Sequence, residues 1–418
     1  MTSQFTTIRD IANAFARAMN LIDPTLQKHH EKVAYLSFRL AQTIRLDKKQ
    51  RILALYGGLF HDIGGALKQG NVSLADIESN ARNVAETGAS LLRLFPVTHP
   101  FADIVLESQS PRLRFQKLKK HIATPYLIGQ IVHLADTIVL LCDEATPALN
   151  QVQRIKECIH DNAEEVFDSS VLEAFDILCN YEYVWLDLMY KPELFLDLIE
   201  DNRWLSLDEV VNLTSFMSKI IDFRSPFTAM HSAGVSATAV ALARRVGMSE
   251  NECKMMRIAG YLHDIGKLKI PREILEKPGK LTSEEFNVMK EHVYYTWILL
   301  KDIYGFEQIA TWAAYHHEKL NGNGYPFHLS QEDIPLGSRI MTVADIFSAI
   351  TEERPYRKSM DKEKVISLLR QDAENGLLST RLVNLLVNDY DEINRLRDIE
   401  SKAASKKYQE SLANSSKE

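Results

Sequence analysis

Apolar residues recur at intervals of three and four along most of the chain, which is the period of an amphipathic α-helix. Clear examples are 235–247, VSATAVALARRVG, and 338–350, SRIMTVADIFSAI. Strict alternation of apolar and polar residues, which is typical of half-buried strands, is nearly absent. The pattern therefore predicts an all-α protein.

The helical pattern contains an internal repeat. Residues 29–64 align with 231–266, a shift of 202 positions (231 minus 29), and both segments end in HDIG. The predicted helix starts also agree, because 47–50 (DKKQ) aligns with 249–252 (SENE) and both fit a capping box or a close variant of one. We therefore expect two helical domains of similar size.

The predicted domain boundary lies near 200–204, EDNRW, a polar break before a new amphipathic helix. We expect one domain in residues 1–203 and another in residues 204–397. Residues 398–418 are predicted to form a polar, frayed tail.

Composition narrows the class of protein. Hydrophobic residues make up 45% and charged residues 25% of 418 residues, which is normal for a soluble globular protein. The first ten residues lack the basic start and apolar run that are typical of a signal peptide, and no uninterrupted apolar run is long enough for a membrane span, so we expect neither. Four scattered cysteines, Cys142, Cys158, Cys179 and Cys253, indicate reduced thiols in a cytoplasmic protein. The net charge of −7 argues against a polymeric nucleic acid or an anionic membrane as partner. The basic run 112–121 fits a lid or a partner surface less well than a solvated helix face.

Histidines and aspartates in apolar helical surroundings indicate a metal site, because such groups are rarely buried without a partner. Any one of them alone would be an ordinary core residue, but the second copy of the repeat holds seven candidates: His231, His263, Asp264, His292, His316, His317 and Asp345. Adjacent helical residues project about 100° apart, so the doublets 263–264 and 316–317 need a wide site. Either one member binds metal while the other meets substrate, or two ions lie side by side, about 3.5–4 Å apart.

Residues 207–395 resemble an HD-GYP domain, a bacterial subclass of the HD metal-dependent phosphohydrolases. The resemblance rests on HDIGK at 263–267, the isolated His292, HHE with GNGYP at 316–326, and 339–359, RIMTVADIFSAITEERPYRKS. It implies an all-helical fold with two, sometimes three, iron or manganese ions. It also implies hydrolysis of cyclic di-GMP or 3'3'-cyclic GMP-AMP by a metal-bridging hydroxide, with a linear dinucleotide as product.

The resemblance also implies roles for individual residues. The seven candidates would be the metal ligands, with Asp264 as the bridge. Lys267 would hold a phosphate oxygen, and Arg354 and Arg357 would contact the substrate's phosphates, although surface salt bridges are the plainer interpretation of these arginines. Gly322, Gly324 and Pro326 would shape a loop that fixes Tyr325 near the site; a simple turn between helices is the alternative.

Several positions depart from the usual motif. Lys319 and Asn321 differ only mildly from the residues usual in the family. Members with a third ion have Glu at the position of Phe227, so we expect two ions. Ser225 replaces a common Asp and bears on base selectivity. VYYTW, 293–297, places larger side chains near the expected pocket wall.

The first copy of the repeat keeps only His29, His61, Asp62 and Asp136, the minimal ligand set of the HD superfamily, and so fits one ion or none. It could be an inactive regulatory or dimerising domain, a mononuclear phosphohydrolase, or a structural remnant. The first is favoured because Gly65 replaces the lysine and the GYP loop is missing. Six further histidines match no ligand position and are predicted to be ordinary: His30, His99, His121, His133, His160 and His328.

Three functions fit the second copy. A cyclic-dinucleotide phosphodiesterase is favoured by the complete ligand set with Lys267. A non-catalytic sensor or interaction protein would have shown a damaged HD, HH or GYP motif, and a general (d)NTP phosphohydrolase fits the superfamily but not the GYP signature. We also expect a homodimer, since twofold oligomers are common.

Overall fold

The computed structural model describes residues 4–21, 28–65, 80–94, 96, 98–109, 120–161, 166–193, 198, 203–223, 230–352 and 359–415. Apart from two short strands, the regular elements within these ranges are helices, so the all-α prediction is confirmed. In chain order they are β1 Gln4–Thr7, α1 Ile8–Met19, α2 His29–Thr43, α3 Lys48–Phe60, α5 Ala81–Arg93, α6 His99–Glu107, α7 Lys120–Leu141, the 3₁₀ helix η4 Ala148–Gln151, α8 Val152–His160, α10 Ser169–Leu178, α11 Glu182–Tyr190, β2 Trp204–Ser206, α12 Leu207–Phe223, α13 His231–Arg245, α14 Glu250–Leu262, the 3₁₀ helix η6 Ile265–Lys269, α15 Arg272–Leu275, α16 Ser283–Leu300, α17 Glu307–Ala314, α18 Leu336–Thr351, α19 Lys362–Glu374, α20 Thr380–Asn388 and α21 Tyr390–Ser415.

Contacts divide the chain into two compact units. One consists mainly of Asp23–Lys68 and Val72–Arg203 and is called the first domain below. The other, the second domain, consists mainly of Trp204–Glu410 together with Met1–Ile22. The start of the chain therefore packs with the second domain, whereas the expected boundaries assigned residues 1–203 to a single domain.

Two strands tie the start of the chain to the second domain. β1 pairs antiparallel with β2, with Gln4 opposite Ser206 and Thr7 opposite Trp204. Helix α1 then packs against α16, where the Arg17 Nη2 donates a hydrogen bond of 3.0 Å to the carbonyl of Ile298. The sequence pattern did not predict these strands, because four and three residues are too short to show alternation.

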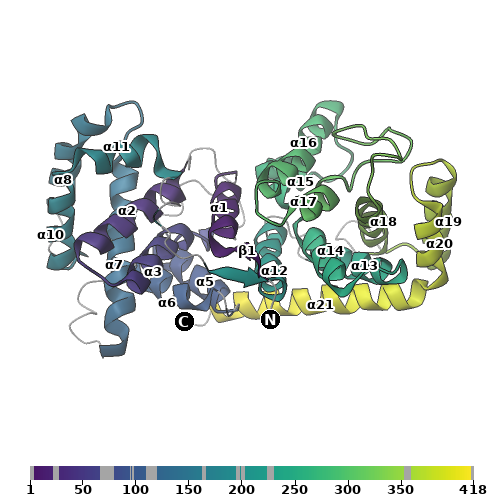
Figure 1. Cartoon of the computed structure of the whole chain (residues 1–418), viewed down its shortest axis with the longest axis horizontal. Helices are drawn as coiled ribbons and strands as arrows, with labels where there is room; N and C mark the ends of the chain where they lie inside the picture. The colour runs from purple at the N-terminus through teal and green to yellow at the C-terminus, as the bar shows by residue number, and fades with distance from the viewer. Residues whose placement is uncertain are drawn as a thin grey trace. The chain divides into compact units, whose positions relative to one another are not determined.

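As far as Ser415 the structure differs from the frayed tail expected from residue 398. Helix α21 continues to Ser415 without a break and is drawn as one long helix in Figure 1. Ile393 and Arg397 are buried on the second domain, and the Ser401 hydroxyl donates a 3.2 Å hydrogen bond to the carbonyl of Met230. A polar sequence thus forms an ordered helix because one of its faces is packed.

The internal repeat appears as two matching pairs of helices, α2 with α3 and α13 with α14. Both capping boxes are present, formed by Asp47 with Gln50 and by Ser249 with Glu252. In both pairs a glycine lets the helices approach closely: a Cβ on Gly260 would lie 2.5 Å from the Cα of Ser236. Because the two helices of each pair cross so closely, the second helix ends beside the start of the first. The HD motif follows directly after that end.

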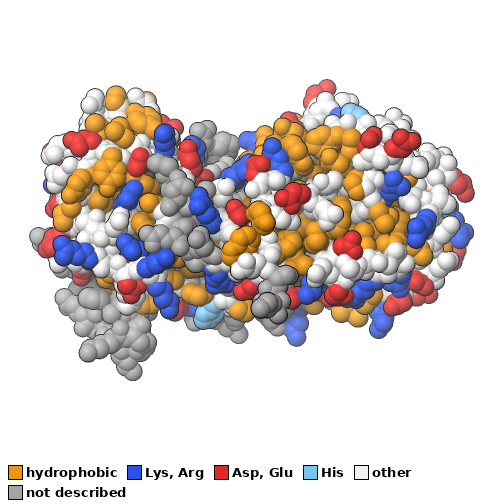
Figure 2. Space-filling view, in the orientation of Figure 1, with side chains coloured by type: hydrophobic (Ala, Val, Ile, Leu, Met, Phe, Trp, Pro, Cys, Tyr) orange, Lys and Arg blue, Asp and Glu red, His pale blue; other side chains and the backbone are white. Residues whose placement is uncertain are grey.

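Among the described residues, one segment passes a length and composition test for a membrane span, namely Thr124–Leu141 within α7. More than half of this segment is buried, and α7 packs against α2, α3 and α6 of the first domain. Core helices pass the same test, so this is weak evidence for a span. The face shown in Figure 2 carries a mixture of acidic and basic side chains.

Candidate metal centre

All seven predicted ligands of the second domain lie in one cluster. They come from five places in the chain: His231 at the start of α13, His263 and Asp264 after α14, His292 on α16, His316 and His317 after α17, and Asp345 on α18. Possible ligand atoms lie within 4.8 Å of one another in two groups, His231 with His263 and Asp264, and His292 with His316 and His317. The arrangement fits two ions rather than one.

Three of these histidines are oriented in the same way. Each donates its Nδ1–H to the backbone carbonyl three residues earlier: His263 to Gly260 at 2.8 Å, His292 to Met289 at 2.5 Å, and His316 to Ala313 at 2.6 Å. A hydrogen bond at Nδ1 fixes the tautomer and leaves Nε2 as the ligand atom.

The side-chain atoms that remain without a hydrogen bond are the ones that a metal ion would bind. Nε2 of His263, His292 and His316 and the Asp264 Oδ1 are buried and have no hydrogen-bond partner. Buried polar atoms without a partner are rare and costly. Neutral imidazole nitrogens with carboxylate oxygens are a donor set for iron, manganese, zinc or nickel, so these residues fit divalent metal ions.

Asp264 lies between the two groups of ligands. Its Oδ2 is 3.2 Å from the His263 Nε2, and its Oδ1 is 3.4 Å from the His292 Nε2. The Lys267 Nζ donates a 2.6 Å hydrogen bond to Oδ2 of the same carboxylate. This placement suits a carboxylate that bridges two ions, with an ammonium group beside it.

His231 has a different support, which the sequence did not reveal. Its Nδ1–H donates to the Oε2 of Glu352 at 3.0 Å, while its Nε2 lies 3.0 Å from the Asp345 Oδ1. Both His231 and Glu352 are buried. A carboxylate behind a ligand histidine fixes the ring and strengthens it as a donor.

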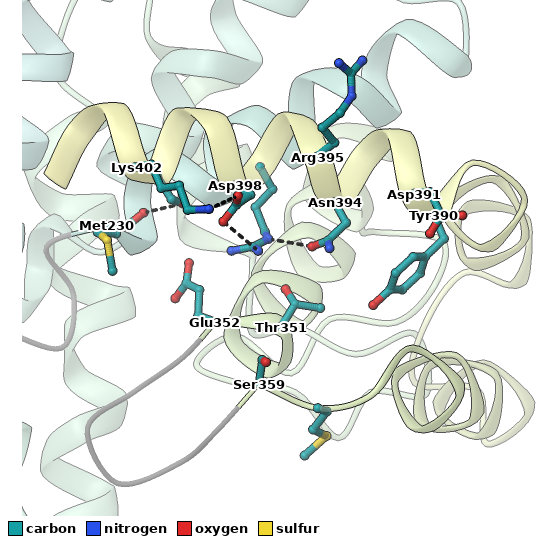
Figure 3. A pocket seen from close by; sticks show the side chains of 13 residues that line it. Met230, Thr351, Glu352, Ser359, Tyr390, Asp391, Asn394, Arg395, Asp398 and Lys402 are labelled. Atoms are coloured by element: carbon teal, nitrogen blue, oxygen red, sulfur yellow. Dashed lines mark hydrogen bonds and ion pairs between the residues drawn. The ribbon is translucent and has the colours of Figure 1, made fainter. Parts of the chain in front are cut away.

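Glu352 also lines a cavity of about 560 Å³ on the second domain (Figure 3). Its Oε1 is buried and has no hydrogen-bond partner. Around it in Figure 3 lie Thr351, Ser359 and side chains of α21, including Asp398, which pairs with Lys402. Glu352 thus separates this polar cavity from His231.

The loop after the histidine doublet is held by Glu318, which explains the glutamate in the HHE motif. Its Oε1 accepts from the backbone N–H of Phe327 at 2.8 Å, and its Oε2 accepts from that of Leu329 at 3.0 Å. Glu318 is buried, so these bonds fix the loop that carries Tyr325. The Tyr325 ring lies 4.9 Å from the ring of His317, centroid to centroid, as expected for a residue at the site.

The two glycines of this loop, which were expected to shape it, act in different ways. Gly322 has a φ of +78°, a conformation that favours glycine. Gly324 does not have a positive φ; a Cβ there would lie 2.4 Å from the Cα of Glu318. Gly324 is therefore needed for close packing of the loop on the HHE segment.

Within VYYTW, it is Thr296 that supports the site, a second residue that sequence reasoning missed. Its hydroxyl donates to the carbonyl of His263 at 2.9 Å and accepts from the N–H of Gly266 at 3.1 Å. It thereby holds α16 against the HD motif. The larger Tyr294 is 46% exposed and does not narrow the site.

The protonation states of the buried histidines are compatible with metal binding. Burial lowers the pKa of His292 to about 4 and that of His316 to about 3, so both rings are neutral near pH 7. Burial also lowers the pKa of His231, but the carboxylates of Glu352 and Asp345 outweigh this and raise it to about 10. His231 therefore carries a proton whenever no metal ion balances these carboxylates.

The first domain also brings its four predicted ligands, His29, His61, Asp62 and Asp136, into one group within 4.8 Å. Two other histidines of this domain lie in its core. His30 is 1% exposed with neither ring nitrogen hydrogen-bonded, and the His133 Nδ1 is likewise buried without a partner. His99 and His328 are exposed, and the partly exposed His160 pairs with Asp176.

Some predicted residues lie outside the described part of the chain. They are Arg354, Arg357, Phe227, Ser225 and most of the basic run 112–121. The side chain of His121 also lies outside it.

Known proteins resemble this chain in sequence. The family model of the HD domain matches residues 215–378. The chain is 27% identical over 412 residues to 3'3'-cGAMP-specific phosphodiesterase 1 of Vibrio cholerae serotype O1, covering 94% of both proteins. It is 38% identical over 176 residues to a cyclic di-GMP phosphodiesterase response regulator of Xanthomonas campestris pv. campestris, covering 41% of this chain and 46% of that relative.

A solved structure shows the same fold. The crystal structure of a cyclic GMP-AMP-specific phosphodiesterase of V. cholerae superposes with a TM-score of 0.63 at 18% identity, over 93% of this chain and 98% of that one. Residues 215–378 of the second domain thus match the HD domain model, and the chain as a whole shares its fold with this solved structure.

Proposed function

We propose that the second domain hydrolyses a cyclic dinucleotide, cyclic di-GMP or 3'3'-cyclic GMP-AMP, to a linear dinucleotide. The observation that carries this proposal is the convergence of seven histidine and aspartate side chains beside Lys267 and the loop that holds Tyr325. Relatives named as phosphodiesterases of both cyclic dinucleotides support it.

Seven residues would hold two divalent ions, with Asp264 between them: His231, His263, Asp264, His292, His316, His317 and Asp345. When bound, two such ions would activate a water molecule and neutralise charge on the phosphate oxygens. Water attacks phosphorus and the bond to the 3' oxygen breaks, so the product has a 5' phosphate and a free 3' hydroxyl. Lys267, which is paired with Asp264, is placed to hold a non-bridging phosphate oxygen.

Iron or manganese is the proposed metal, because imidazole and carboxylate ligands without cysteine suit either. Arg354 and Arg357 stay predicted contacts to the substrate's phosphates. A homodimer in the bacterial cytoplasm is proposed as the setting, with the first domain in a regulatory or dimerising role. A monodisperse monomer in solution scattering at micromolar concentration would contradict the dimer.

The test is a turnover assay on protein reconstituted anaerobically with Fe(II) or Mn(II). Cyclic di-GMP and 3'3'-cyclic GMP-AMP are followed by chromatography, beside an Asp264→Ala control. We expect metal-dependent linear product from at least one substrate and none from the control. Lys267→Ala is expected to keep its metal ions and lose turnover by about 100-fold, as when one charge-stabilising donor is removed.

The alternatives give different results in the same assay. A sensor would bind a cyclic dinucleotide without forming product, although two ions are bound. A general (d)NTP phosphohydrolase would release phosphate from nucleotides and leave cyclic dinucleotides intact. Either outcome would overturn the proposal.

A further inference from the structure

The polar cavity beside Glu352 has a wall formed by the end of α18 and by α21, and the proposed phosphodiesterase does not use it (Figure 3). Its volume of about 560 Å³ is in the range of sites that bind small molecules. The described residues that line it include none of the seven proposed metal ligands. The cavity is therefore a candidate for a second site in this domain.

Glu352 brings an unused hydrogen-bond acceptor to this cavity. Its side chain is only 7% exposed, and its Oε2 accepts from the Nδ1–H of His231. Its Oε1 is buried and has no hydrogen-bond partner in the described part of the chain. Figure 3 shows the carboxylate pointing toward α21. A buried carboxylate oxygen without a partner is costly, so Oε1 calls for a donor from a ligand.

Arg397, on α21, brings unused donors to the same cavity. Its side chain is also only 7% exposed. The Nε–H donates to the Asn394 Oδ1 at 3.0 Å, which orients the guanidinium group. The Nη2 lies 3.9 Å from the Asp398 Oδ1, which is too far for a hydrogen bond. Among the described residues neither Nη atom is hydrogen-bonded, and a buried guanidinium with free donors calls for an acceptor.

The two side chains approach each other at Gly234 of α13. A Cβ on this glycine would lie 3.0 Å from the Glu352 Oε1 and 3.2 Å from the Arg397 Cγ. The structure describes both residues and gives no ion pair between them, because Glu352 pairs with His231 and Arg397 with Asp398. One ligand could therefore bind the carboxylate and the guanidinium at the same time.

A carboxylate and a guanidinium side by side complement guanine. The N1–H and the N2 amino group of guanine donate hydrogen bonds, whereas its O6 and N7 accept two bonds from the fork of an arginine. Adenine presents an amino donor beside N7 and matches an arginine fork less well. Tyr390 is 6% exposed and adds an aromatic side chain to the cavity wall, and its hydroxyl end points toward Thr351 in Figure 3. Aromatic side chains of this kind pack well against bases.

We propose that this cavity binds the guanine base of a nucleoside or nucleotide. The Glu352 Oε1 accepts a hydrogen bond from the N1–H or the N2 amino group, and the Nη atoms of Arg397 donate to O6 and N7. The base would lie on the side of Glu352 that faces away from His231. Binding there needs no turnover and so does not depend on the proposed phosphodiesterase activity.

Equilibrium dialysis of labelled guanosine against the full chain, loaded with Mn²⁺, tests the site. Guanosine is the probe because it has no phosphate through which the metal ions could bind it. We expect one guanosine per chain. Adenosine lacks both O6 and the N1–H, so it should compete about tenfold less well or worse. Absence of guanosine binding, or equal competition by adenosine, would overturn the assignment to guanine.

Variants of Arg397 tell this cavity from any other place where guanosine could bind. Arg397→Met removes the guanidinium and keeps an apolar stem, and we expect the affinity for guanosine to fall by about tenfold or more. Arg397→Lys keeps the positive charge without the fork and should also bind guanosine more weakly, so it carries the test if the methionine variant does not fold. The matched control is Arg381→Met, at an exposed arginine of α20, which should bind guanosine as the unaltered protein does. Unaltered affinity in a folded Arg397 variant would show that guanosine binds elsewhere and would overturn the proposal.

Discussion

At the scale of single residues, the proposed ligand histidines of the second domain differ in the group that accepts the hydrogen bond from their Nδ1. Backbone carbonyls hold His263, His292 and His316, whereas the carboxylate of Glu352 holds His231. A carboxylate makes the imidazole a stronger donor than a neutral carbonyl does. His231 should therefore depend most on its partner.

Replacing this partner tests its role. In Glu352→Gln the amide oxygen can still accept the Nδ1–H of His231, but the negative charge is lost. We expect Mn²⁺ affinity and turnover to fall by roughly 10–100-fold, as is typical when such partners are removed. Titration with Mn²⁺ measures the affinity, and Glu363→Gln, an exposed change at the start of α19, is the control. Equal affinities in the two variants would show that Glu352 does not support the ligand.

The candidate ligands that the structure brings together could be picked out from the sequence, whereas the residues that support them could not. His263, Asp264, His316 and His317 stand in recognisable short motifs, so their types and spacing were enough. Glu352 and Thr296 act only through contacts with segments 121 and 33 residues away along the chain. Such pairs depend on how helices pack, and neither residue stands out in its local sequence.

At the scale of elements, the loop that carries Tyr325 depends on one buried carboxylate. Glu318 accepts two backbone N–H bonds from this loop. In Glu318→Gln the amide NH₂ would face one of these N–H groups, leaving a buried donor without a partner at a cost of about 1–3 kcal/mol.

We therefore expect Glu318→Gln to lower the melting temperature of the second domain and to reduce turnover about tenfold or more, because Tyr325 would be less well fixed. Scanning calorimetry and the chromatographic assay measure the two effects. The matched control is Glu332→Gln, an exposed glutamate in the same loop region. Unchanged turnover in a destabilised Glu318→Gln protein would separate loop stability from catalysis.

Elements with strong local signals were predictable, and those defined by distant contacts were not. Capping boxes and helical periodicity located α3 and α14 correctly because the information lies within a few residues. The pairing of β1 with β2 joins residues about 200 positions apart, and the order of α21 depends on a surface that the tail covers. Neither contact can be recognised from the local pattern of apolar and polar residues.

At the scale of the whole molecule, the two copies of the repeat have diverged in chemistry while keeping the same helical frame. Within the described residues the second group of candidate ligands lies in the second domain, and the sequence has the lysine and the GYP loop in the second copy of the repeat. We therefore expect His61→Ala to leave turnover of the cyclic dinucleotide largely intact, within about twofold, while stability or regulation changes. The chromatographic assay on the full chain checks this, and a large loss in a folded variant would give the first domain a direct part in the reaction.

The buried histidines of both domains predict how the metal-free protein responds to acid. Burial lowers the pKa of His292 to about 4 and the pKa values of His316 and His30 to about 3, whereas an unfolded chain has ordinary values near ~6.5. Between pH 6.5 and about 4 the unfolded chain therefore binds more protons than the folded one. Stability must fall as the pH falls through this range.

The other shifted groups do not cancel this trend. The raised pKa of His231, about 10, contributes stability that is fully present below ~6.5 and is lost only in alkali. The pKa values of Asp264 and Asp345 lie well below their usual range, because His263 and His231 outweigh the effect of burial, so their contribution is lost only below about pH 4. Between pH 6.5 and 5 the histidines with lowered pKa values dominate.

We expect the melting temperature of the metal-free protein to fall by roughly 5–10 °C from pH 6.5 to pH 5. Scanning calorimetry at constant ionic strength measures the change and can resolve separate transitions of the two domains. His30→Gln removes one such group and should flatten the dependence in the first domain only. A melting temperature that is constant over this range would mean that these imidazoles have hydrogen-bond partners or solvent access in the folded protein.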